Sequence, residues 1–385
     1  MLLTNLALLL PFLLSALAIP TQHAFEVPTD TTGFSLDLDE LRLVQFGHDE
    51  PPVWISELDK IKAKAEGKRF MDITDTPTLG FSNFLLPSTA NVKYSYPSPG
   101  NYSKPIKAIH STLDLDFMKT TLTKFSSFRT RYYRSETGKD SQRWLMEQLK
   151  TIAGETPNVS IKEFTHPWGQ NSLIARFEPV HKKDAKAPVT IIGAHQDSTN
   201  QWPFLPSPGA DDDGSGTTSS LTAFRSLIAA NYTPSTPVEF HYYSAEEGGL
   251  LGSQAIAKSY EEKSIKVLAM LQMDMTAWVK QGTVESVGII TDFVDPDLTE
   301  FVYDLVNKYL AIPPLKTKCG YACSDHSSFS KAGYQSAFSI ESSFENSNHN
   351  IHTSQDTIDH PEFSFTHMRE FSKLAVAFAV ELAGI

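Results

Sequence analysis

A short acidic stretch is the first part of this sequence that could do chemistry. In "YSAEEGGLLGS", Glu246 and Glu247 stand side by side between an apolar run and a pair of glycines. Two adjacent carboxylates repel each other, and each raises the pKa of the other unless a cation lies beside them. The pair is therefore either a solvated part of a loop or part of a site that holds a positive ion.

Four more stretches contain residues of the same kind, namely "GAHQDS", "PGADDDGSG", "QMDMT" and "NIHTSQDT". Imidazoles and carboxylates without cysteine are the donors that bind Zn²⁺ through nitrogen and oxygen. So many donors favour two metal ions over one, and such a pair shares a bridging carboxylate and a bridging water. One glutamate of the acidic pair would then be a ligand, and its neighbour would be free to take a proton from the water. The candidates are His195, Asp197, Asp211, Asp212, Asp213, Asp274 and His352.

The elements that position these residues can be predicted from the apolar pattern. "VTIIGA", "VEFHYY", "VLAMLQM" and "SAFSIE" are short apolar runs typical of buried strands, and amphipathic helical patterns separate them. This alternation predicts a three-layer α/β/α fold with a mostly parallel, mixed central sheet. In such sheets ligands bind beyond the carboxyl ends of the strands. Because each strand is followed by a histidine or a carboxylate, we expect the candidates to meet at one rim.

Each candidate taken alone also has an ordinary explanation. A histidine at a strand end is usually a core or surface residue, and Asp211 to Asp213 can cap a helix N-terminus. Asp197 follows His195 closely enough to accept a hydrogen bond from the second ring nitrogen and fix the tautomer. Ordinary explanations at every strand end would require a coincidence, so we interpret the set as a metal site.

Charge and the N-terminus indicate where the protein works. The chain of 385 residues has a net charge of -12 and a pI near 5.5, which argues against nucleic-acid or anionic-membrane partners. Residues 1–18, "MLLTNLALLLPFLLSALA", have the apolar core and small-residue end of a secretory signal peptide. No later run is long and apolar enough to span a bilayer. We therefore expect a secreted, extracellular protein, with glycosylation sequons at Asn101, Asn158 and Asn231.

The only two cysteines, Cys319 and Cys323, stand four residues apart in "KCGYACSD". They could be free thiols or half of a metal site. With no further cysteine in the chain, a thiolate zinc site is disfavoured, and an oxidising compartment favours a disulfide. We expect that disulfide to fix the local shape of its loop.

The chain changes character at about residue 90. Residues 19–88 are charged and interrupted by prolines, with short amphipathic helices expected near residues 56–66, and a Pro/Ser/Asn-rich linker follows. In a secreted chain this layout predicts a propeptide at 19–88 and a catalytic domain at 89–385; a permanent N-terminal subdomain is the alternative. Lys68-Arg69 and "STAN" near residue 90 are both candidate cleavage sites.

From about residue 105 onward the chain resembles the secreted leucine aminopeptidases of fungi and bacteria, which are co-catalytic dizinc metallopeptidases. The resemblance is carried by six motifs in a fixed order, and the upstream "FMDITDT" is similar to the propeptide of the fungal members. The motifs are "GAHQDS", "PGADDDGSG", "YSAEEGGLLGS", "QMDMT", "CGYACSDH" and "NIHTSQDT".

The resemblance implies a role for each candidate residue and two Zn²⁺ ions per subunit. His195 and Asp274 would bind one zinc, Glu247 and His352 the other, and Asp212 would bridge them. Glu246 would be the general base, and Asp197 would orient His195. Substrate contacts would come from the Tyr321 hydroxyl and from an apolar pocket. The pocket residues are Met275, Ile340, Phe344 and Ile351.

The implied protein is a monomeric zymogen that releases leucine or other apolar residues from peptides with a free N-terminus. Its own propeptide would act as an inhibitor or a folding aid. A secreted glutaminyl cyclase-like acyltransferase is the alternative on the same scaffold, but it uses one zinc and lacks an equivalent of His195. A metallo-carboxypeptidase would need a cation for the C-terminal carboxylate of its substrate. A metal-free binding module would have lost ligand positions, whereas all five are filled here.

Overall fold

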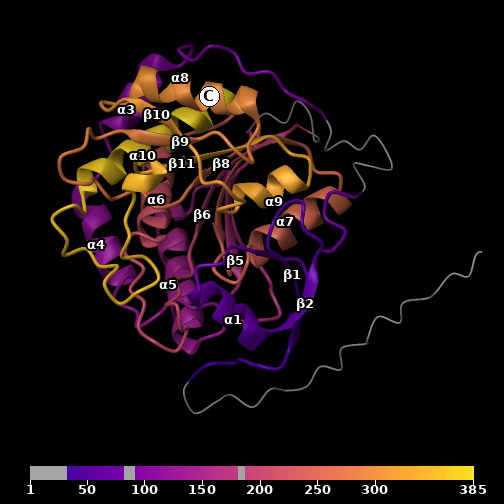
Figure 1. The fold of residues 1–385 in the computed structure, drawn as a ribbon. Helices are drawn as coiled ribbons and strands as arrows, with labels where there is room; N and C mark the ends of the chain where they lie inside the picture. Colours follow the sequence, from indigo (N-terminus) through magenta and orange to yellow (C-terminus); the bar gives the residue numbers. More distant parts are fainter. Residues whose placement is uncertain (1–32, 82–91, 181–186) are drawn as a thin grey trace, which may run out of the picture.

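The computed structural model describes residues 33–81, 92–180 and 187–385 (Figure 1). The expected signal peptide at 1–18 and the expected boundary at residue 88 lie outside these ranges. Across the ranges that are described, no helix has both the length and the apolar character that a membrane crossing requires.

An eight-stranded mixed sheet forms the centre of the molecule, as the sequence predicts. β6 pairs in parallel with both β7 and β8, and β8 pairs in parallel with β11. The antiparallel pairs are β4 with β5, β5 with β7, and β9 with β11. In spatial order the strands are β10 (Pro314–Thr317), β9 (Val287–Ile290), β11 (Ser336–Ile340), β8 (Val267–Met273), β6 (Val189–His195), β7 (Val238–Tyr243), β5 (Ser172–Phe177) and β4 (Val159–Phe164).

Helices cover both faces of this sheet, which confirms the three-layer architecture (Figure 1). Neighbouring residues of β6 point to opposite layers, because side chains alternate along a strand. Ile191 packs in one core cluster with Tyr260 of α7, and Ile192 packs in the other with Phe224 of α6. One layer holds α3 (Ser103–His110), α4 (Leu115–Phe125), α5 (Glu136–Ala153), α6 (Gly214–Ala229), α8 (Pro296–Tyr309) and α10 (Phe365–Ala383), and the other holds α7 (Leu251–Glu262) and α9 (His326–Lys331).

Residues 34–81, called the N-terminal segment below, form a small subdomain of their own. It contains β1 (Leu41–Gln45), β2 (Val53–Ser56), α1 (Glu57–Ala65) and β3 (Met71–Asp72), with the strands in the antiparallel order β2-β1-β3. The helix was expected, and Ser56 caps it by accepting from the Asp59 amide. The sheet was not expected, since strands of two to five residues leave little pattern in a sequence. In Figure 1 the segment, in indigo, lies beside α7 and α9.

Candidate metal centre

The residues predicted at the strand ends do gather at one rim of the sheet. His195 is the last residue of β6, Asp274 follows β8, and Glu246 and Glu247 lie in the turn between β7 and α7. Asp212 stands two residues before α6, and His352 lies in a loop after β11. The parallel order of β7, β6 and β8 brings their carboxyl ends together, so it places these side chains side by side.

Asp212 lies between the two histidines. Its Oδ1 is 3.0 Å from Nε2 of His195, and its Oδ2 is 3.1 Å from Nε2 of His352. Asp274 Oδ1 lies 3.5 Å from Nε2 of His195, and Glu247 Oε2 lies 3.0 Å from Nε2 of His352. The five expected ligands therefore form two sets that share one aspartate. We call them the His195 group (His195, Asp212, Asp274) and the His352 group (His352, Asp212, Glu247).

The neighbouring Asp213 is also close enough to His195 and Asp274 to complete a metal-binding set. Its two carboxylate oxygens, however, accept from backbone amides. Oδ2 accepts from His195 N at 3.0 Å, and Oδ1 accepts from Met275 N at 3.1 Å and from Gly216 N at 2.9 Å, which caps α6. These bonds show that Asp213 holds the backbone of two loops that carry expected ligands. Asp212, whose two oxygens face the two histidines, is therefore the better candidate for the carboxylate that bridges the two metal ions.

The donor set fits metal ions because several of its atoms have no partner. Oδ1 of Asp274 and Oε1 of Glu247 are buried and make no hydrogen bond to any of the described residues, and the buried Nε2 of His195 faces only the carboxylates of Asp212 and Asp274. Buried polar atoms in proteins nearly always have a partner. Nitrogen and oxygen donors without thiolates match Zn²⁺, so these residues fit a pair of zinc ions.

The electrostatics of the rim also favour cations. Burial alone would lower the pKa of His352, but the Glu247 and Asp212 carboxylates raise it to about 9. Burial alone would raise the pKa of Asp212, but hydrogen bonds to His195 and His352 hold it well below its usual range. The carboxylates thus favour the charged form of His352, and the two imidazoles favour the charged form of Asp212, so positive charge is stabilised in this buried space.

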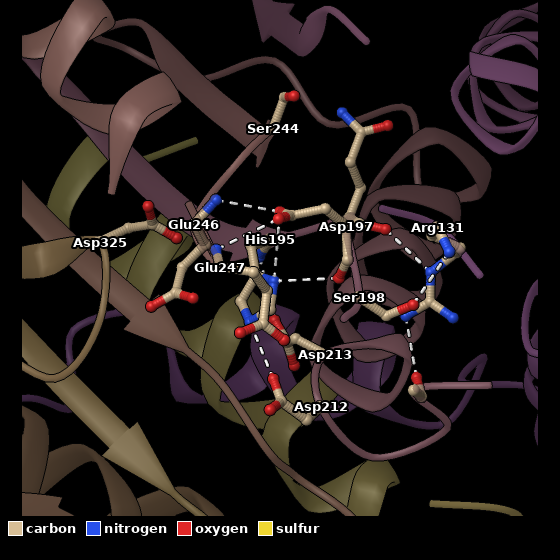
Figure 2. A network of polar contacts seen from close by, with 12 residues as sticks. Arg131, His195, Asp197, Ser198, Asp212, Asp213, Ser244, Glu246, Glu247 and Asp325 are labelled. Carbon is tan, nitrogen blue, oxygen red and sulfur yellow. Dashed lines mark hydrogen bonds and ion pairs between the residues drawn. The ribbon is translucent and has the colours of Figure 1, made fainter. Parts of the chain in front are cut away.

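Asp197 contacts both halves of the site (Figure 2). Its carboxylate oxygens accept from the backbone amides of Glu246 and Glu247, each at 3.1 Å. Nδ1 of His195 lies 3.5 Å from the Asp197 carboxylate and 3.2 Å from the Asp197 backbone oxygen. The residue expected to orient His195 is thus also the one that holds the acidic turn in place.

Two positioning contacts were not predicted. The carboxylate of Asp356 accepts from the backbone amides of Asp211 and Asp212, at 3.0 and 3.1 Å. The Ser324 hydroxyl donates to Asp274 Oδ2 at 2.6 Å. Both residues stand in motifs that the sequence had already singled out, but the sequence carries no sign of which loop each one contacts.

Glu246 is set apart from its neighbour by its surroundings. Burial raises its pKa well above the usual range, and the charges of Glu247 and Asp325 add to that rise. Figure 2 shows the Asp325 carboxylate close by. A carboxylate with a raised pKa, next to ligand-type residues, is suited to general acid–base chemistry.

All five expected substrate-contacting residues line one cleft of about 370 Å³ together with Glu246 and four of the five expected ligands, Asp212, Asp274, Glu247 and His352. Four of them, Met275, Ile340, Phe344 and Ile351, pack in a single apolar cluster with Phe338, which was not predicted. Tyr321 lies in the loop closed by the Cys319–Cys323 disulfide, so the expected pairing of the cysteines is confirmed. Burial raises the pKa of the Tyr321 hydroxyl to about 12, so it remains a hydrogen-bond donor at neutral pH.

Buried nitrogen and oxygen donors meet at one rim of an α/β sheet, and a glutamate that is not needed as a ligand lies beside them in the same cleft. This combination is typical of a metal-dependent hydrolase. The model of peptidase family M28 matches residues 173–379, and the chain belongs to that family. It is 48% identical over 346 residues to leucine aminopeptidase 1 of Chaetomium globosum, covering 86% of this chain and 82% of the relative. It is 44% identical over 392 residues to leucine aminopeptidase 1 of Pyrenophora tritici-repentis, covering 98% of both.

The LapA aminopeptidase of Legionella pneumophila has the same fold. Its crystal structure superposes with a TM-score of 0.77 at 29% identity, covering 90% of this chain and 94% of that one. The similarity to the Pyrenophora tritici-repentis relative covers 98% of this chain, so it extends well outside the matched family region and includes the N-terminal segment. The family resemblance that the sequence motifs implied is confirmed.

Proposed function

We propose that this chain is a secreted zinc aminopeptidase that releases leucine or other apolar residues from the free N-terminus of peptides. The enzyme class is the one the sequence predicts, a zinc-dependent aminopeptidase and hydrolase. One observation carries the finer proposal: a single cleft is lined by carboxylates of both metal groups, by Glu246 and by an apolar pocket. The cleft therefore has room for a peptide bond at the metal groups and for an apolar side chain beside it.

Two zinc ions, held by the His195 and His352 groups, would polarise the substrate carbonyl and lower the pKa of a bound water. Glu246 would take the proton of that water and pass it to the leaving amine. The Asp197 carboxylate supports this step by holding the Glu246 amide, at 3.1 Å. Tyr321, which lines the same cleft, would donate a hydrogen bond to the oxygen that gains negative charge.

The charges of the cleft support cleavage from the N-terminus. The lysine and arginine side chains among its lining residues are Lys64, Lys68 and Arg69, and all three belong to the N-terminal segment. The catalytic part of the described chain thus offers the cleft no lysine or arginine that could hold a substrate's C-terminal carboxylate. The presence of His195, 3.0 Å from Asp212, argues against a cyclase with a single zinc.

The layout supports a zymogen. We propose that residues 1–18 direct secretion, that 19–88 are a propeptide and that 89–385 are the catalytic domain. The propeptide would inhibit the enzyme or aid its folding. The exposed side chains of Asn101 and Asn231 suit glycosylation, while Asn158 is partly buried. We expect a monomer that binds peptides and neither nucleic acid nor membranes.

Hydrolysis of leucine p-nitroanilide, measured beside its N-acetylated form, tests this function. The processed protein would be assayed as isolated, after chelation, and after zinc is added back. We expect cleavage of the free-amine substrate alone, lost on chelation and restored by zinc. If a zinc-loaded protein cleaves neither substrate, the proposal is wrong, and cyclisation of N-terminal glutamine becomes the activity to test.

A further inference from the structure

A lysine from the N-terminal segment reaches into the metal centre. Lys64 lies in the last turn of α1, and its Nζ is 2.5 Å from Glu247 Oε2 and 2.8 Å from the Glu247 backbone oxygen. The Glu247 side chain is 2% exposed, so the ammonium has entered a nearly closed space. This is a contact between a predicted propeptide residue and an expected zinc ligand.

The ammonium contacts Oε2 of Glu247, the carboxylate oxygen that faces the rest of the His352 group. Glu247 Oε2 is the atom 3.0 Å from Nε2 of His352, whereas Oε1 has no hydrogen-bond partner among the described residues. Lys64 makes no contact of this kind with His195 or Asp274. The lysine therefore pairs with a ligand of the His352 group and with none that belongs only to the His195 group.

A set of bonds to the acidic turn fixes α1 in this position. Lys60, one turn before Lys64, donates to Gly248 O at 3.4 Å. The amide of Asp72 donates to Gly249 O at 3.1 Å, and the Gln254 side chain donates to Asp72 O at 2.9 Å. The N-terminal segment is thus hydrogen-bonded to the turn that carries Glu246 and Glu247.

Buried ion pairs inside the segment favour the arrangement that places the lysine there. Asp72 Oδ2 accepts from Arg42 at 2.8 Å and from Lys60 at 2.9 Å, and all three side chains are buried. Burial alone would raise the pKa of Asp72, but these two cations lower it to about 2. Breaking one partner out of a buried pair is strongly unfavourable, so the cluster favours one arrangement of α1 and β3.

We infer that the N-terminal segment is a resident ligand of the metal centre, in which the Lys64 ammonium takes the place of a metal ion on Glu247. The uncut chain would then bind one zinc tightly, in the His195 group, and a second only weakly, in the His352 group. This inference rests on the proposed zinc centre. It goes beyond simple obstruction of the cleft, because it ties release of the segment to completion of the metal pair.

Charge supports this competition. An ammonium and a metal ion on the same carboxylate oxygen repel each other, and a buried site screens this repulsion less than bulk water does. Every 1.4 kcal/mol corresponds to about a tenfold change in an equilibrium constant. We therefore expect Lys64 to weaken the second zinc by at least about tenfold.

The test is equilibrium zinc binding to the intact full chain, with its uncut state verified by mass. Lys64→Met removes the charge at similar length, and Lys64→Gln is a second variant that keeps a donor for the Glu247 backbone oxygen. Lys62→Met is the matched control, since Lys62 is exposed on the same helix and pairs only with exposed Asp59, at 3.4 Å. Bound zinc is counted after dialysis against buffers of fixed free zinc.

We expect one tight and one weak zinc in the wild type and in Lys62→Met, and a second zinc bound at least about tenfold more tightly in both Lys64 variants. Equal affinities in all four proteins would overturn the inference, and so would weaker binding in the Lys64 variants. The readout is bound metal, so a missing activity of the processed enzyme would sink the proposed function without touching this result. Absence of zinc from every protein would instead remove the zinc centre, and the inference with it.

Discussion

The two metal groups share Asp212 but differ in what surrounds them. The side chain of His195 is 1% exposed, and buried contacts from Asp213 and Ser324 hold its loop and its partner Asp274. The side chain of His352 is 18% exposed, and its partner Glu247 is paired with Lys64 of the N-terminal segment. The described part of the N-terminal segment makes no ion pair with the first group, whereas its Lys64 pairs with a carboxylate of the second. We therefore expect the first zinc to bind whether or not the N-terminal segment is in place, and binding of the second zinc to depend on that segment.

The largest expected effect comes from a residue that lies in neither group. Glu246→Gln should leave both zinc ions in place and lower turnover by about 10²–10⁴-fold, the range for a lost acid–base group. The measurement is kcat beside the zinc content of the same sample. Near-normal turnover in a zinc-replete variant would rule out the role of Glu246.

The position of Asp212 can be disturbed through Asp356, which holds its backbone amide. Asp356→Ala removes the acceptor of the Asp211 and Asp212 amides, and two buried donors without partners should cost about 3 kcal/mol of folding free energy. Urea unfolding measures this loss, and Asp359→Ala, an exposed change in the same region, is the control. Equal stability of the two variants would show that Asp356 does not hold the Asp212 turn.

Acid should weaken the fold independently of both metal groups. Burial lowers the pKa of His166 to about 3, below the ordinary value of about 6.5. The native state then binds fewer protons than the unfolded state, so the stabilisation is complete above pH 6.5 and is lost as the pH falls from 6.5 toward 3. Between pH 7.5 and pH 5 the wild type should lose about 1–2 kcal/mol more than His166→Gln. Parallel curves for the two proteins in urea unfolding would contradict this.

The smallest effect concerns the three sequons. Asn101 and Asn231 are exposed, whereas the Asn158 amide donates to the backbone oxygens of Glu178 and Tyr232, at 3.4 and 3.3 Å. We expect Asn101→Gln and Asn231→Gln each to remove the mass of one glycan without changing turnover, and Asn158→Gln to leave the mass unchanged. Intact-protein mass checks this, and a glycan on Asn158 would be the contrary result.

The sequence predicted the centre of the fold well, because buried parallel strands leave long apolar runs. β6, β7 and β8 were all expected, and the rule that ligands gather at the carboxyl ends of strands explains why His195, Glu247 and Asp274 meet. The antiparallel pair β4–β5 and the short sheet of the N-terminal segment were not predicted. β4 is half-exposed and the strands of the N-terminal segment are only two to five residues long, so their apolar pattern is weak. β5 is mostly buried, but Arg176 interrupts its apolar run.

Contacts between distant loops were beyond the reach of the sequence. Asp356 lies 144 residues from Asp212, and Lys64 lies 183 residues from Glu247. Nothing in the local pattern of a charged residue indicates a partner that only the folded topology brings near. The same holds for the choice between Asp212 and Asp213, since both are buried carboxylates and only their hydrogen bonds separate the bridge from the helix cap.

The measurement that tests the metal centre most directly is anomalous diffraction at the zinc edge, from crystals of the processed enzyme. We predict two peaks, one among His195, Asp212 and Asp274 and the other among Asp212, Glu247 and His352. A single peak, or peaks away from Asp212, would contradict the shared centre on which the proposed function depends.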